Sequence, residues 1–151
     1  MYALIIAALF TSTFALACPD LSGTYAVCRS TTGQLSGASD LVVTQENTDE
    51  GTDYLMVSTN DETQEREYGP LIADGKLITA VGTDADTGMQ VTTTIISTCG
   101  ENDVLSKLAV SFGDMKVLDI AVQYFKVGNQ LHQVTSGSTM QGPVNDTVIC
   151  E

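Results

Sequence analysis

Apolar residues of this chain recur at every second position, and short clusters of turn-forming residues separate one such run from the next. In residues 104–112, Val104, Leu108 and Val110 fall on one face of an extended chain and Lys107 falls on the other. This period of two is typical of a half-buried β-strand, whereas a helix repeats about every 3.6 residues. Because no run of ten or more residues shows the helical period, the pattern predicts an all-β domain.

Turn signals set the expected strand boundaries. Asp74-Gly75 and Gly128-Asn129 each favour a two-residue hairpin, because Gly and Asn adopt positive φ at little cost. Consecutive hairpins give an antiparallel up-and-down meander of eight to ten strands. The expected strands cover residues 22–29, 39–46, 53–59, 65–73, 76–82, 89–98, 104–112, 115–127 and 130–139, with a short one at 146–150.

An open sheet exposes two edges with unpaired backbone groups, and closure of the sheet removes them. A closed barrel is therefore the first expectation and a two-sheet β-sandwich the second, because both produce the same alternation. Residues 136–146 are loose in composition and contain Gly142-Pro143. We expect this segment to cross an open end of the barrel.

The N-terminal residues have the composition of an export signal. Residues 3–10 are uncharged and apolar, and Ala15 and Ala17 supply the small side chains that a signal peptidase reads. The apolar run is too short to span a bilayer, which takes roughly 20 residues. We therefore expect residues 1–17 to be a signal peptide, although they hold no Lys or Arg, and residues 18–151 to form a single secreted or periplasmic domain.

The four cysteines are Cys18, Cys28, Cys99 and Cys150, an even number that suits two disulfides in an exported domain. A lipid anchor on Cys18 is the alternative, but Ala15 occupies the position where lipoprotein signals usually have Leu. Three pairings of four cysteines exist. We favour Cys18 with Cys28 and Cys99 with Cys150, and the other two pairings stay open.

The charge of the chain limits its partners. The net charge is −13 at pH 7, and the six basic residues are scattered along the sequence. A phosphate-binding surface needs clustered Lys or Arg, so the composition excludes nucleic acid as a partner. Solubility explains the acidity, with recognition of a basic protein partner as the alternative.

The stretch 21–25 opens the first expected strand with Gly23-Thr24-Tyr25. This motif, followed by a hairpin meander and a C-terminal cysteine, resembles the lipocalin-like or calycin group, in which an aromatic ring after a glycine fills the narrow end of the barrel. The resemblance implies a small β-barrel that holds an apolar ligand. The chain departs from the pattern in having Tyr25 where the group has Trp, and the absence of Trp argues against biotin binding of the avidin type.

Residues with catalytic or metal-binding chemistry are few. His132 is the only histidine, and no serine lies in a GxSxG motif, which argues against a catalytic triad or a multi-histidine zinc site. Residues 84–88 resemble the start of a calcium loop, but Ile95 occupies the place where a bidentate Glu is needed. We expect a solvated hairpin there, no enzyme activity, no metal and no cofactor.

The remaining candidate site is the barrel interior. If Tyr25 points inward, alternation places Val27 on the same side, and small strand residues leave room for a small hydrophobic ligand. The alternative is a packed core in a protein-interaction module, such as an envelope-associated adaptor or a protease inhibitor. The expected ligand-binding residues are Tyr25, Val27, Leu55, Val57, Leu108, Val110, Ile120, Val122 and Tyr124.

Overall fold

The computed structural model describes residues 18–35 and 37–151, so the expected signal peptide at 1–17 lies outside the described residues. The described chain forms eleven antiparallel strands and no helix, and it therefore contains no helical segment able to cross a bilayer. The predicted all-β meander is confirmed. The strands are β1 (Gly23–Tyr25), β2 (Cys28–Ser30), β3 (Ala38–Asn47), β4 (Thr52–Asn60), β5 (Arg66–Ala73), β6 (Ile78–Thr83), β7 (Gln90–Cys99), β8 (Asp103–Phe112), β9 (Met115–Val127), β10 (Gln130–Thr139) and β11 (Gly142–Cys150).

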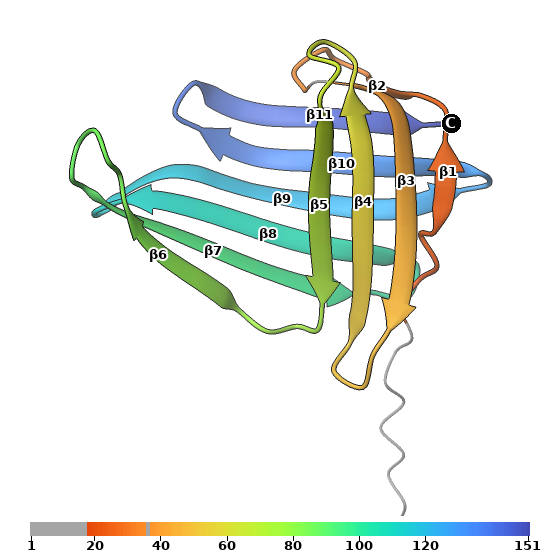
Figure 1. Ribbon diagram of the computed structural model, residues 1–151, viewed down its shortest axis with the longest axis horizontal. Coiled ribbons are helices and arrows are strands. Elements are labelled where there is room, and N and C mark those ends of the chain that lie inside the picture. Colours follow the sequence, from red (N-terminus) through yellow and green to blue (C-terminus); the bar gives the residue numbers. More distant parts are fainter. Residues whose placement is uncertain (1–17, 36) are drawn as a thin grey trace, which may run out of the picture.

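The strands form one strongly curled sheet in the order β5-β4-β3-β2-β11-β10-β9-β8-β7-β6, and β1 pairs with β3 beside this path. Figure 1 shows β3, β4 and β5 crossing the long strands β7 to β10 at a steep angle, so that the sheet folds over itself as a half-barrel. The end strand β5 contacts β7 and β8 across the concave side. The sheet is curled as a barrel is, but its two end strands are not paired with each other.

The link between β5 and β6 explains why the ring stays open. Asp74-Gly75 was expected to form a two-residue hairpin, but β5 and β6 do not pair. Gly75 has a positive φ of 72° and donates its N–H to the carbonyl of Ser97 on β7, at 2.9 Å. The chain is thus carried from one side of the half-barrel to the other. The hairpin predicted at Gly128-Asn129 is confirmed by the β9–β10 pairing.

The C-terminal hairpin corrects the expectation for residues 136–146. These residues do not cross an open end but continue the β10–β11 ladder from Ser136 opposite Asn145 to Thr139 opposite Gly142. Pro143 is tolerated because β2 pairs with β11 only at 148–150, which leaves the other side of β11 unpaired at Pro143.

The first expected strand, 22–29, is split into β1 and β2. Val27, between them, exchanges backbone hydrogen bonds with Glu151, the last residue. Tyr25 is buried, and an added Cβ at Gly23 would lie 3.0 Å from its hydroxyl, so the ring folds back over the glycine. The Tyr25 hydroxyl donates to the carbonyl of Leu21, which is also fully buried. The aromatic residue of the motif is therefore part of the core.

The disulfides join Cys18 to Cys99 and Cys28 to Cys150, so the pairing we favoured is wrong. The physical reason is the sheet order. The split after β1 lets β2 pair with β11, which places Cys28 directly opposite Cys150, with a Cα–Cα distance of 4.0 Å. Cys18 lies beside the end of β7, where Cys99 is found. Two disulfides indicate an oxidising, extracellular environment.

Candidate functional site

The concave side of the half-barrel holds two adjoining cavities. The inner cavity, of about 410 Å³, lies between β5 and strands β6 to β9. The end cavity, of about 420 Å³, lies nearer β2, β3 and β11. Met56, Gly69 and Tyr124 line both cavities. The concave side therefore presents one hollow, and these three residues mark its narrowing.

The wall of the inner cavity is a row of apolar residues that runs across four strands. Ile78 lies opposite Ile95, Ile95 opposite Leu108, and Leu108 opposite Ile120. Directly opposed residues of antiparallel strands point to the same face. Each of these four side chains consequently faces the hollow. Gly137 of β10 lies opposite Ile120. Its φ is +145°, and an added Cβ there would clash with the Asp119 carbonyl oxygen.

The structure brings together four of the nine expected site residues. Leu108, Ile120, Val122 and Tyr124 line the inner cavity together. Val110 has the same parity as Leu108 on β8 but is outside the cavity lining. The first four are well placed for an apolar ligand, and their role in binding stays a prediction.

The other expected residues lie elsewhere. Tyr25 is only 2% exposed and belongs to the core. Val27 lies in the link between β1 and β2, beside Arg29. Leu55 and Val57 alternate with Met56, which lines the cavities, and Leu55 is 44% exposed on the other face of β4. Alternation along β4 was read correctly, but it does not say which of the two faces is concave.

Several cavity residues were missed by sequence reasoning. Ile78 and Ile95 complete the apolar row, and Met56 and Gly69 are opposed to each other on β4 and β5. The period of two in 89–98 contained a signal for Ile95. Gly69 gave no such signal, because a glycine has no side chain to indicate which face of the sheet it belongs to. Its face becomes clear only when its strand partner is known.

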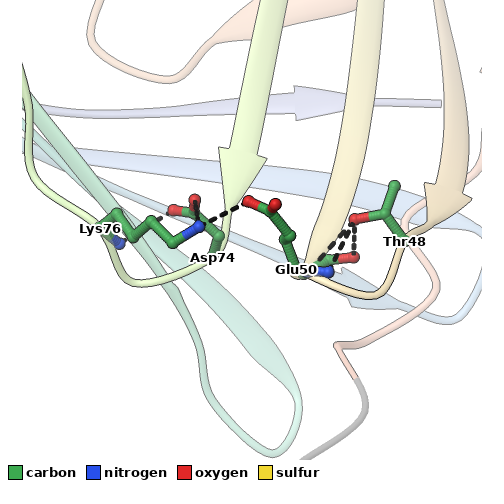
Figure 2. A network of polar contacts seen from close by, with 5 residues as sticks. Thr48, Glu50, Asp74 and Lys76 are labelled. Atoms are coloured by element: carbon green, nitrogen blue, oxygen red, sulfur yellow. Dashed lines mark hydrogen bonds and ion pairs between the residues drawn. The ribbon is translucent and has the colours of Figure 1, made fainter.

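The polar groups around the inner cavity can be accounted for one by one. Its polar side chains are Lys76, Ser97, Ser106 and Tyr124. Ser97 donates a hydrogen bond to Ser106 at 3.0 Å, so these two hydroxyls are partners. The Lys76 Nζ lies 2.6 Å from Glu50 Oε2 and 3.6 Å from Asp74 Oδ2. Figure 2 shows Lys76 between these two acidic residues. This cation is therefore already paired, and the hydrogen bond and the charge of Glu50 raise the pKa of Lys76.

Tyr124, which is partly buried, differs from the buried Tyr25 and Tyr54. The Tyr25 and Tyr54 hydroxyls donate to backbone carbonyls, whereas the Tyr124 hydroxyl has no such partner among the described residues. Burial raises the pKa of Tyr124 to about 12, so its hydroxyl stays protonated throughout the physiological range.

Asp146 holds the loop that borders the end cavity. Its carboxylate is buried and accepts hydrogen bonds from the hydroxyl of Ser30 and from the backbone N–H groups of Thr32 and Leu35. Burial alone would raise the pKa of Asp146, but the hydrogen bonds from Ser30, Leu35 and Thr32 outweigh it and hold the pKa well below the usual range. Leu35, which lines the end cavity, is thereby fixed in place.

The described residues offer little for catalysis or metal binding. No three His, Cys, Asp or Glu side chains in 18–35 and 37–151 are grouped so that they could hold a metal ion. His132 stacks on Phe125 with ring centroids 5.3 Å apart, and its buried Nε2 has no hydrogen-bond partner in this part of the chain. The main feature of the site is therefore a hollow with a largely apolar wall.

Comparison with protein-family models found no match, and searches of curated proteins and of solved structures also found none. The class that the structure defines is therefore an all-β antiparallel half-barrel with two disulfides, a shape compatible with a lipocalin-like fold.

Proposed function

We propose that this protein is an exported, lipocalin-like carrier that holds a small hydrophobic molecule in the inner cavity. The observation that carries the proposal is the apolar row Ile78, Ile95, Leu108 and Ile120, which faces a hollow of about 410 Å³. Ligand pockets typically measure about 300 to 1,000 Å³ and are lined mainly by apolar side chains. A protein-interaction module with a packed core would have these positions filled, so the hollow favours the carrier.

Export to the periplasm or the cell exterior fits the same proposal. The apolar residues 3–10 have the composition of a signal peptide, and both disulfides need an oxidising compartment to persist. A carrier of apolar molecules is useful in such compartments, because its cargo is poorly soluble in water.

Native mass spectrometry of the oxidised protein purified from its own source tests the proposal. We expect a reproducible small mass that is present in the native spectrum, disappears on denaturation and is recovered by organic extraction. A native mass equal to that of the polypeptide with two disulfides and nothing bound would contradict the carrier function. The protein should be kept free of detergent, because a detergent molecule would compete for the same cavity.

A further inference from the structure

We infer that the Tyr124 hydroxyl selects the ligand of the inner cavity, and that the ligand is an apolar molecule with one neutral hydrogen-bond acceptor, such as the carbonyl of a ketone, ester or amide. The inference rests on the proposed carrier function and adds the chemical class of its ligand. It is an inference about recognition rather than about a reaction, because no bond is made or broken.

The first argument is the inventory of polar groups. Of the four polar side chains that line the inner cavity, Ser97 and Ser106 are bonded to each other and Lys76 is paired with two carboxylates. The Tyr124 hydroxyl is the one of these four groups that makes no hydrogen bond or ion pair within the described part of the chain. A ligand that accepts a hydrogen bond from it gains affinity over one that does not.

The second argument is the position of Tyr124. It lines both cavities at the narrowing marked by Met56 and Gly69. A ligand with its apolar body along the Ile78-to-Ile120 row therefore has its far end within reach of this ring. Gln133, directly opposite Tyr124 on β10, lines the end cavity and supplies a neutral amide beside the same point.

The third argument concerns charge and excludes carboxylate ligands. The one cation on the inner cavity wall, within the described part of the chain, is Lys76, and it is already paired with Glu50 and Asp74. Glu67 lines the end cavity, and the whole chain has a net charge of −13. A carboxylate would lose its hydration without gaining a counter-charge, whereas a carbonyl group loses much less.

Three probes of equal size separate these cases. They are 2-acetylnaphthalene with a neutral acceptor, 2-isopropylnaphthalene with none, and 2-naphthoate with a carboxylate. Equilibrium dialysis against the oxidised, ligand-stripped protein gives the three dissociation constants. We expect 2-acetylnaphthalene to bind about three- to tenfold more tightly than 2-isopropylnaphthalene, the range that one neutral hydrogen bond gives, and 2-naphthoate to bind most weakly.

Two variants locate the effect. Tyr124→Phe removes only the hydroxyl and should abolish or reverse the preference for the acetyl probe, because its carbonyl then has no hydrogen-bond partner, with no loss of affinity for the isopropyl probe. Tyr68→Phe is the matched control, because Tyr68 lines the end cavity but is 66% exposed, so its hydroxyl is solvated. That variant should keep the wild-type preference.

The outcomes distinguish the two proposals. Equal binding of the acetyl and isopropyl probes to the wild-type protein would overturn the role of Tyr124 and leave the carrier function intact. Tightest binding of 2-naphthoate would overturn the ligand class. Failure of all three probes to bind would overturn the carrier proposal together with the inference that depends on it.

Discussion

At the scale of single residues, the most informative position is Gly69. Its place opposite Met56 makes it the smallest part of the cavity wall, and an added Cβ would meet only the Cβ of Met56, at 4.0 Å. A larger side chain can therefore grow into the hollow without disturbing the backbone. The hollow is kept open at this point by the absence of a side chain.

Gly69→Leu should fill the narrowing and lower the affinity for 2-isopropylnaphthalene at least tenfold, while the free energy of unfolding changes by less than about 1.5 kcal/mol. Gly82→Leu is the control, because an added Cβ there meets nothing within 4 Å and β6 is exposed. Equilibrium dialysis and urea unfolding check both variants. Unchanged affinity in Gly69→Leu would contradict our placement of the ligand.

Asp146 gives a second prediction at this scale, on pH. Because its pKa is lowered in the folded protein, its stabilising contribution is complete above the unfolded value of about 3.9 and is lost as the pH falls through and below that value. Asp146→Asn should lower the free energy of unfolding at pH 7 by about 1 to 3 kcal/mol, since a hydrogen-bonded charge is removed.

Urea unfolding from pH 7 down to pH 3 measures this effect. The difference between wild type and Asp146→Asn should shrink as the solution becomes more acid. Asp86→Asn, in the exposed turn after β6, should change stability by less than about 0.5 kcal/mol at any of these pH values. A difference that stays constant down to pH 3 would show that the charge of Asp146 is not what stabilises the loop.

At the scale of strands, β2 is the place where the sheet has the fewest paired residues. It pairs with β11 at three positions and with β3 at one, whereas neighbouring ladders such as β9–β10 extend over ten. The Cys28–Cys150 disulfide crosses the β2–β11 pair directly. This bond therefore reinforces the place where the sheet has the fewest hydrogen bonds.

Replacing Cys28 and Cys150 together by Ala should lower the free energy of unfolding by about 2 to 4 kcal/mol. Hydrogen exchange should accelerate first in β2 and at 148–150, while the long β8–β9 ladder keeps its protection. Replacing Cys18 and Cys99 is the control, because Cys99 remains paired with Val104 in the β7–β8 ladder. Equal acceleration at β2 in both variants would contradict this account.

At the scale of the whole molecule, local patterns predicted the strands, but not how the two ends of the sheet meet. Alternation and turn residues are local, so nearly every expected strand was found. The Gly75 N–H bonds to Ser97 on β7 instead of closing a hairpin between β5 and β6, and the Cys28–Cys150 pairing follows from β2 meeting β11. These are contacts between distant residues, for which one sequence contains no direct signal.

In the candidate site, too, local patterns predicted some residues, and contacts between distant residues determined the others. Of the interior residues expected on β8 and β9, Leu108, Ile120, Val122 and Tyr124 line the inner cavity, whereas Val110 does not. On β4 the opposite face was chosen, because both of its faces carry apolar residues. The role of Asp146 was not predicted, since its hydrogen-bond partners, within residues 30–35, are 111 to 116 positions away in the sequence.

The order of the strands also has a consequence for biosynthesis. The first and last parts of the chain meet in the middle of the sheet, at β2 and β11, while the mid-chain strands β5 and β6 form its edges. A chain emerging from its N-terminus can build the β3–β5 and β6–β10 meanders as it appears, but their pairing into one continuous sheet through β2 waits for β11. The end cavity, whose lining includes Val148 of β11, is therefore completed only when this strand is in place, whereas every residue that lines the inner cavity, from Met56 to Tyr124, has been made before it.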